Sequence, residues 1–293
     1  MIQTPLVSIV CTTYNHQAYI KDALEGFVMQ QTNFPFEIIV HDDASTDRTV
    51  EIIKEYELKY PGLFFNIYQE TNQYSKGNGD VGKIVYAAPK GKYVAMCEGD
   101  DYWTDPLKLQ KQVDFLEQNK EYSLVCHDAL ILNQIDNSSR LFYNSNNKKK
   151  HTFSTNDTFN VHLCPTASIV YRKLPDFLNE QLSKGRNTGD QMLIQLISLT
   201  GLIFRMDDVM SVYRIHPQGI SQVSTEGLIR GLKDKVANLL IFNEVSGKRF
   251  QKDIWLTIFV VKRRIKFLKT PSTINRKLFS FSKILNKGLK KIF

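Results

Sequence analysis

The chain has 293 residues, of which 42% are hydrophobic and 23% are charged, enough for one large α/β domain or two smaller ones. This composition excludes a wholly disordered protein. The longest apolar stretch, Ile254–Val261, is much shorter than the ~20 residues of a membrane-spanning helix. The N-terminus has no basic start followed by an apolar run, so we expect no secretory signal.

The charge is unevenly distributed along the chain. The formal net charge is +8, but residues 248–293 hold fourteen Lys or Arg and one acid, Asp253. This segment therefore carries +13, which leaves −5 for the other 247 residues. A basic tail on a mildly acidic body is not the pattern of a nucleic-acid-binding domain, and we expect no nucleic acid partner.

The four cysteines, Cys11, Cys97, Cys126 and Cys164, show no metal-ligand spacing, and three of them lie in apolar runs. This usage fits a reducing compartment, so we predict a cytoplasmic protein, placed at the inner face of the plasma membrane if the basic tail binds lipid.

Strand and helix patterns alternate over the first hundred residues. Apolar, β-rich runs predict strands at 6–11, 36–41, 63–68 and 92–97. Amphipathic spacing predicts helices at 17–30 and 49–60. Strands separated by helices predict an α/β fold with a mostly parallel central sheet flanked by helices, in which ligands bind at the carboxyl ends of the strands.

The second half continues this pattern with longer interruptions. Pro106 lies in the first turn of a predicted helix that ends near residue 119. Further strands are expected at 123–132, 167–172 and 202–206, a helix at 189–199, and a long polar loop at 133–160. We predict two halves of one domain on the same sheet, 1–105 and 106–222, followed by a helical, basic C-terminal extension, 223–293.

An acidic cluster follows the strand predicted at 92–97. It consists of Glu98, Gly99, Asp100 and Asp101. Carboxylates gathered at a strand end repel one another, and a hard cation such as Mg²⁺ or Mn²⁺ would compensate that repulsion. The alternative is an acidic turn in which Asp105 caps the next helix.

Two further strand ends carry polar residues. Thr12–His16 follows the first strand and could hold a nucleobase or ribose, or it is an ordinary strand-to-helix turn. Asp42–Asp47 follows the second strand, where a carboxylate could accept from a base N–H or a ribose hydroxyl, or the segment is a capping turn.

Three segments together resemble the family 2 glycosyltransferases: Val7–Asn15, Ile39–Thr49 and Glu98–Trp103. They occur in the family's order, each at a predicted strand end, and the similarity covers roughly residues 5–222. The resemblance implies a GT-A fold for residues 1–222, a nucleotide-diphospho-sugar donor, a divalent metal (Mn²⁺ or Mg²⁺) and inversion at the anomeric carbon. The half 1–105 would bind the nucleotide sugar and the half 106–222 the acceptor.

The resemblance also implies roles for the residues at the first two strand ends. Thr12 and Tyr14 would contact the base and the ribose of the donor. Asp43, or its neighbour Asp42, would accept from the N3–H of a base such as uracil.

The acidic cluster would correspond to the family's Asp-x-Asp metal motif. Glu98, Gly99 and Asp100 would fill it and contact the donor, although the first acid is Glu rather than Asp. Asp100 is therefore the predicted metal ligand, and Glu98 would reach the metal or the ribose. Asp101 would lie on the acceptor side.

The resemblance places the remaining candidates later in the chain. Asp190, at the start of a predicted helix, would be the general base that takes the acceptor proton; otherwise it is an acid favoured by the helix dipole. His216 would bind the metal or the diphosphate, or it is a structural histidine. Arg214 would face a phosphate or the acceptor, and His127 would line the acceptor side.

One motif is rejected at the sequence level. Gly77, Gly79 and Gly82 match the dinucleotide-binding pattern Gly-x-Gly-x-x-Gly, but that motif must follow a strand directly and open a helix. Seven polar-biased residues, 70–76, intervene. We predict a flexible loop over the donor site, in which Lys83 or Lys76 meets phosphate.

The basic tail mixes apolar and cationic residues from Trp255 to Ile292. Such segments can lie on an anionic membrane surface, although the same pattern fits the solvated face of terminal helices.

We therefore predict an inverting glycosyltransferase of the hexosyltransferase type. It would move a sugar from a nucleotide-diphospho-sugar, in the first instance a UDP-sugar, to a saccharide or lipid-linked saccharide in bacterial capsule, O-antigen or exopolysaccharide synthesis. One alternative is a nucleotidyltransferase, which usually needs a Gly-rich, basic phosphate loop that Cys11–Tyr19 lacks. Another is a non-enzymatic membrane- or nucleic-acid-binding protein that acts through its basic tail.

Overall fold

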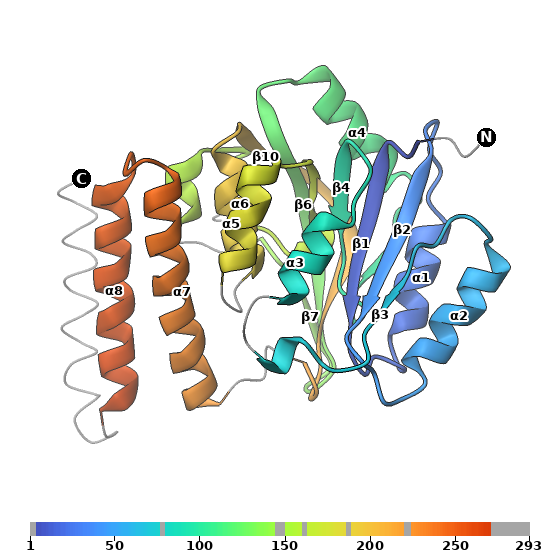
Figure 1. Ribbon diagram of the computed structural model, residues 1–293, viewed down its shortest axis with the longest axis horizontal. Helices are drawn as coiled ribbons and strands as arrows, with labels where there is room; N and C mark the ends of the chain where they lie inside the picture. Colours follow the sequence, from blue (N-terminus) through green and yellow to red (C-terminus); the bar gives the residue numbers. More distant parts are fainter. Residues whose placement is uncertain are drawn as a thin grey trace.

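The computed structural model describes residues 4–76, 80–143, 150–159, 163–185, 189–219 and 224–270. Its centre is a ten-stranded mixed sheet with helices on both faces (Figure 1). The strand order is β3-β2-β1-β4-β9-β6-β10-β5, with β7 added beside β6 and β8 beside β10.

The first part of the sheet is parallel, as the alternation of strands and helices predicts. It contains β1 (Val7–Thr13), β2 (Phe36–Asp42), β3 (Ile67–Tyr68) and β4 (Tyr93–Met96). Helices α1 (Ile20–Val28) and α2 (Thr49–Lys59) connect these strands. Only β3 is much shorter than expected.

The second half of the chain completes the same sheet. It supplies β5 (Tyr102–Trp103), β6 (Tyr122–Asn133), β9 (Val170–Arg172) and β10 (Leu202–Ile215). The short strand β9 runs antiparallel between β4 and β6, so β6 and its parallel neighbour β10 point the same way as β1 to β4. The long strands therefore end at one edge, and the prediction of a mostly parallel sheet is confirmed.

Several element predictions for the second half were wrong. The polar segment predicted as the loop 133–160 contains β7 (Ser138–Leu141), β8 (Thr152–Phe153) and a 3₁₀ turn at Thr155–Thr158, because β6 and β10 offer edges with which short polar strands can pair. The strand predicted at 202–206 continues to Ile215 through register shifts between Arg205 and Ser211.

Two helices were not predicted. The segment that we expected to be a flexible loop over the donor site contains the helix α3 (Asp80–Ala87). Residues 77–79, which precede this helix, lie outside the described part of the chain. A second helix, α5 (Asp176–Lys184), precedes α6 (Gly189–Ser198). Both α3 and α5 pack on the sheet through their apolar faces.

Alternate side chains of the central strands point into two separate cores. Val10 and Met96 join one apolar cluster, and Ile9 and Ala95 join the other. Helices α1, α2 and α4 (Lys108–Gln118) cover the second cluster, and α3, α5 and α6 cover the first. Alternation along a strand thus produces a three-layer arrangement.

The described part of the C-terminal extension, 224–270, is helical, as predicted. Helices α7 (Thr225–Val245) and α8 (Gln251–Lys269) form an antiparallel pair at the end of the molecule opposite α1 and α2 (Figure 1). Leu239 and Phe242 of α7 and Ile254 and Ile258 of α8 belong to the same apolar cluster as α6. The extension therefore shares the core of the body, and its treatment as a separate unit stays a prediction.

One charged side chain is enclosed between the sheet and α4. Lys108 is 0% exposed; its Nζ donates to Gln112 Oε1 at 2.8 Å and lies 4.0 Å from the Trp103 ring centroid. Burial lowers the pKa of Lys108 to about 7. The enclosed ammonium is a net cost to stability, because hydrogen bonding to one amide does not replace its hydration.

Replacing Lys108 with Met is expected to raise the free energy of unfolding at pH 7 by about 1–3 kcal/mol, since it removes this desolvation cost. Between pH 7 and the ordinary lysine pKa, the unfolded chain binds the Lys108 proton and the folded chain does not. The wild type should therefore gain stability relative to Lys108→Met as pH rises through that window. Urea unfolding of both proteins at the two ends of the window measures this, and an equal difference at both ends would contradict it.

Candidate active site

The site lies at the edge where the parallel strands end. Thr13, the last residue of β1, pairs with Asp42 at the end of β2. The Gly99 N–H donates to the Thr12 carbonyl at 2.9 Å, which holds the acidic turn after β4 against the end of β1. The polar segments that the sequence places at three strand ends are thus brought together.

Close packing against β1 and α1 leaves no room for a side chain at Gly99. A Cβ at this position would lie 2.6 Å from Thr13 Oγ1 and 3.0 Å from Ile20 Cδ1. Any side chain would therefore push the acidic turn away from β1, and the glycine sets the position of the carboxylates on either side of it.

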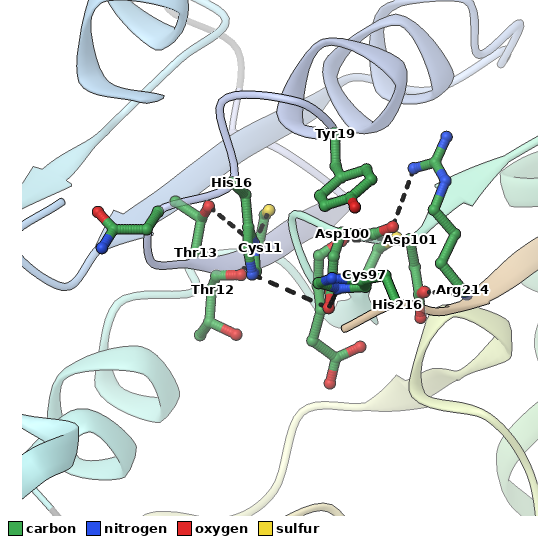
Figure 2. A network of polar contacts seen from close by, with 12 residues as sticks. Cys11, Thr12, Thr13, His16, Tyr19, Cys97, Asp100, Asp101, Arg214 and His216 are labelled. Carbon is green, nitrogen blue, oxygen red and sulfur yellow. Dashed lines mark hydrogen bonds and ion pairs between the residues drawn. The ribbon is translucent and has the colours of Figure 1, made fainter. Parts of the chain in front are cut away.

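Asp100 is the centre of a compact polar network (Figure 2). Its Oδ2 lies 3.1 Å from His216 Nε2 and 3.8 Å from His16 Nε2. His16 Nδ1 in turn lies 3.1 Å from Thr13 Oγ1. The Tyr19 ring packs against His216 with the ring centroids 4.5 Å apart. Asp100 and His216, which the sequence analysis named as metal-site candidates, are therefore in direct contact.

Arg214 and Asp101 tie the end of β10 to the acidic turn. The buried Asp101 carboxylate accepts from the Arg214 backbone N–H at 2.8 Å. The Arg214 guanidinium donates to the Asp100 carbonyl at 2.9 Å and to the Asp22 carboxylate, and it lies 4.3 Å from the Tyr102 ring centroid. Arg214 is 7% exposed, so its visible role is to position the acidic turn rather than to face the acceptor.

Replacing Arg214 with Lys is expected to lower the free energy of unfolding by about 1–3 kcal/mol, because one ammonium cannot bond to both Asp22 and the Asp100 carbonyl in the planar geometry of a guanidinium. The midpoint of urea unfolding, at unchanged slope, measures the loss. Asp22→Asn keeps the hydrogen bond and should cost less. A midpoint for Arg214→Lys equal to that of the wild type would contradict the positioning role.

The pKa of Glu98 is raised by burial and by two other carboxylates. Burial, with the charges of Asp100 and Asp190, raises the pKa of Glu98 to about 8, while a hydrogen bond from the Thr166 side chain opposes the shift. Burial and the charge of Asp100 also raise the pKa of Asp101. Asp190, at the first turn of α6, therefore lies near the acidic turn although 90 residues separate them in the sequence. Burial and the neighbouring carboxylates together disfavour the charged forms of Glu98 and Asp101.

The carboxylates of Asp42 and Asp43, at the end of β2, accept hydrogen bonds that fix two neighbouring loops. Asp42 accepts from the Ser45 backbone N–H at 2.9 Å and from its hydroxyl at 2.5 Å. Asp43 accepts from the backbone N–H groups of Gln73 and Tyr74 at 2.8 and 2.9 Å. Both aspartates are nearly buried, so a base contact would use their remaining lone pairs. Tyr14, by contrast, is 43% exposed beside this edge.

Three predicted residues lie apart from the network around Asp100. His127 is 0% exposed within β6; its Nδ1 lies 2.7 Å from the Asp128 carbonyl, and burial lowers its pKa. A fully enclosed ring offers no surface to an acceptor, so we leave His127 out of the acceptor side. Lys83 is exposed on α3, a helix rather than the predicted loop. Lys76 ends a 3₁₀ turn and bonds to Gln73.

The sequence profile of glycosyl transferase family 2 matches residues 8–176, which include every strand-end segment described above except the end of β10. The chain belongs to glycosyl transferase family 2. This membership favours a glycosyltransferase over both alternatives that the sequence left open.

Relatives in this family include an uncharacterized protein of Mycobacterium tuberculosis, 37% identical over 73% of the chain. The alignment covers 60% of the mycobacterial protein, so the chain matches less than two thirds of that relative. The Escherichia coli enzyme WfaP, a UDP-Glc:α-D-GlcNAc-diphosphoundecaprenol β-1,3-glucosyltransferase, is 33% identical over 40% of the chain and 43% of its own length.

Solved structures show the same fold. Staphylococcus aureus TarS in complex with UDP-GlcNAc matches with a TM-score of 0.62 at 18% identity, over 92% of this chain and 77% of TarS. The mannosyltransferase PcManGT from Pyrobaculum calidifontis, in complex with GDP-Man and Mn²⁺, matches with a TM-score of 0.57 at 15% identity, over 97% and 81% of the two chains. The family 2 glycosyltransferase described here therefore has the predicted GT-A fold.

The residues around Asp100 fit the divalent metal expected in this family. Within the described parts of the chain, no three His, Cys, Asp or Glu side chains are placed to hold an ion by themselves. Hard cations that bridge phosphates commonly take only one or two carboxylates and complete their shell with phosphate oxygens and water. Asp100 and Glu98 offer such carboxylates, and a bound cation would offset the burial and the neighbouring charges that raise the pKa of Glu98.

Sequence reasoning missed the residues that build the second layer of the site. His16, Tyr19 and Asp22 were seen only as parts of a turn and a helix, and Thr166 was not considered. His16 was the one with a signal, because it lies within the strand-end segment Thr12–His16. The contacts of Asp22 and Thr166 with residues more than 60 positions away carry no local pattern.

Proposed function

We propose that this protein is an inverting glycosyltransferase that moves a sugar from a UDP-sugar to an acceptor hydroxyl. The observation that carries the proposal is the polar network of Asp100, His216 and His16 at the carboxyl edge of a GT-A sheet. Beside it, burial and then the charges of Asp100 and Asp190 raise the pKa of Glu98 to about 8. Open α/β sheets bind ligands at this edge. A diphosphate donor needs compensation of negative charge there, and an acceptor hydroxyl needs a base.

The donor would lie over the ends of β1, β2 and β4. Tyr14 is exposed at the edge and available to the base, with Thr12 beside it. Asp43 or Asp42 would accept from the uracil N3–H in addition to the loop contacts that it already makes. Lys83 on α3 would meet a phosphate of the donor. UDP is favoured because the similar enzymes TarS and WfaP are each named with a UDP donor or ligand.

Asp100 would hold the divalent metal, Mn²⁺ or Mg²⁺, with Glu98 and His216 as further candidate contacts. The bound cation would supply Lewis-acid stabilisation of the charge that develops on the leaving diphosphate. His216 lies within hydrogen-bond distance of the Asp100 carboxylate, and Tyr19 packs on its ring, so the carboxylate is oriented before any ligand arrives.

Asp190 would take the proton of the acceptor hydroxyl as the oxygen attacks the anomeric carbon from the face opposite the diphosphate. Its place on the first turn of α6 gives it the rigid support that a base requires. Asp101 would contribute indirectly, by holding the acidic turn in place, since its carboxylate accepts a hydrogen bond from the Arg214 backbone N–H.

The acceptor would be a saccharide, either free or attached to a lipid diphosphate at the inner face of the plasma membrane. WfaP, a relative over part of the chain, is named for a diphosphoundecaprenol-linked acceptor. We therefore propose a role in bacterial surface polysaccharide assembly.

Hydrolysis of the donor tests the reaction without knowledge of the acceptor, because water can replace the acceptor hydroxyl. We expect slow, Mn²⁺-stimulated release of UDP from a UDP-α-sugar, and the first sugar seen by proton NMR should be the β-anomer. Release of the α-anomer would contradict inversion. Cleavage that yields UMP and a sugar phosphate would contradict glycosyl transfer itself.

A further inference from the structure

The solvent side of α8 carries four large apolar side chains. Trp255, Leu256, Phe259 and Val260 are 48, 45, 57 and 46% exposed. Their spacing of i, i+1, i+4 and i+5 places them on one side of the helix, while the opposite side packs on the body. A contiguous exposed apolar patch typically marks an interaction surface, whereas single exposed apolar side chains do not.

The charge around this patch has one sign. Helix α8 contains six Lys or Arg and one acid, Asp253, and therefore carries +5. Asp253 accepts a hydrogen bond from Asn156 Nδ2 at 2.7 Å, which directs it toward the body. The Arg263 guanidinium lies 5.8 Å from the centroid of the exposed Phe259 ring. The exposed side of α8 thus combines apolar surface with cations.

A small groove between α7 and α8 adjoins the patch. It has a volume of about 130 Å³ and is lined by Leu232, Lys235, Thr257, Val260, Val261 and Arg264. Burial, and then the neighbouring charge of Arg264, lowers the pKa of Lys235. Among the described residues, no carboxylate forms an ion pair with either cation. Two cations that face one groove without a counter-charge are suited to an anionic group such as a phosphate.

We propose that this face, which we call the docking face and define as Lys235, Trp255, Leu256, Phe259, Val260 and Arg264, binds the surface of an anionic lipid bilayer. The four apolar side chains would enter the boundary between headgroups and acyl chains, and the groove cations would meet lipid phosphates. The binding is peripheral, since none of the described helices is long and apolar enough to cross a membrane.

Charge complementarity decides between a bilayer and a second copy of the chain. Pairing two docking faces would bring two helices of +5 together, whereas an anionic bilayer neutralises them. The proposal does not depend on the chemistry of the active site. It deepens the proposed function by bringing the enzyme to the leaflet that would hold a lipid-linked acceptor.

The two tryptophans of the chain supply the measurement. Trp103 is 2% exposed and Trp255 is 48% exposed, so a change in emission on binding reports Trp255. The full-length protein is titrated with phosphatidylcholine vesicles, with and without phosphatidylglycerol. We expect a blue shift of the emission only with the anionic vesicles, weakened by salt, and quenching by lipids brominated near the headgroup.

Variants separate the two parts of the docking face. Leu256→Ser with Phe259→Ser should weaken partitioning about tenfold or more, because less apolar area enters the bilayer. Lys235→Gln with Arg264→Gln should weaken it by about fivefold per cation and reduce its salt dependence. Leu58→Ser is the matched control, since Leu58 is 84% exposed on the distant helix α2, and its partitioning should equal that of the wild type.

An unchanged Trp255 emission with anionic vesicles would overturn the proposal. So would partitioning of either double variant equal to that of the wild type, with circular dichroism confirming that the variants are folded. A dimer in light scattering that Leu256→Ser with Phe259→Ser dissociates, without vesicle binding by the wild type, would assign the face to a second copy. Because donor hydrolysis is measured without lipid, failure here leaves the proposed function standing.

Discussion

Replacing Asp190 with Asn is expected to lower the rate of sugar transfer about 10³-fold while the affinity for the donor changes little. Asn keeps the size of the side chain at the start of α6 but cannot take a proton, and a positioned base contributes about 10²–10⁴-fold to a rate. The loss should therefore appear in kcat rather than in KM for the donor.

The control for Asp190→Asn is Asp176→Asn, which removes a first-turn acid from the neighbouring helix α5 and hence an equivalent helix-dipole interaction. It should keep nearly full activity. Removing the Asp190 charge should also lower the pKa of Glu98, because that charge is one of the causes of its upward shift. Full turnover by Asp190→Asn would show that another group serves as the base.

Replacing Asp100 with Asn is expected to weaken Mn²⁺-dependent binding of UDP about 10²-fold or more, since a lost carboxylate contact to a bridging cation removes several kcal/mol. UDP binding without metal should change much less. Isothermal titration of UDP with and without Mn²⁺ gives both numbers. The two titrations separate loss of the metal contact from loss of the nucleotide contacts.

Asp114→Asn on the exposed side of α4 is the matched control and should bind UDP as the wild type does. Glu98→Gln should weaken metal-dependent binding less than Asp100→Asn if Glu98 contacts the ribose or a bound water. Equal metal dependence in Asp100→Asn and the wild type would remove Asp100 from the metal site.

The strand ends of the first hundred residues could be predicted because their signals are local. The apolar runs before Thr12, Asp42 and Glu98 are short, buried strands, and parallel strands must end at one edge. The order of the strands in the sheet could not be predicted, because β9 inserts between β4 and β6 as an antiparallel strand of only three residues. Short strands of this kind are set by their neighbours rather than by their own pattern.

The course of β10 shows why the rest of the site was harder to predict. Asp207 and Asp208 interrupt its apolar pattern and suggest a turn, but they lie where the register of β10 shifts against β6. The strand continues beyond them and delivers Arg214 and His216 to Asp100. The family resemblance identified those two residues as candidates, yet it could not show that Arg214 is buried against Tyr102 and Asp22.

Asp190 was also beyond local prediction. A first-turn acid on an amphipathic helix is ordinary, and nothing in residues 184–199 alone indicates that α6 begins near the acidic turn after β4. Only the fold brings the Asp190 charge close enough to shift the pKa of Glu98. Residues 186–188, which lead into this helix, lie outside the described part of the chain.

The most direct test of the central claim, a metal-assisted nucleotide-sugar site around Asp100, is the thermal unfolding of the full-length protein with a panel of UDP- and GDP-sugars, each with and without Mn²⁺. Ligand at about 100 times its Kd stabilises the folded state by about 2.7 kcal/mol. We expect at least one UDP-sugar to raise the Tm in the presence of Mn²⁺ and to raise it far less without the metal. No metal-dependent rise with any nucleotide sugar would contradict the account.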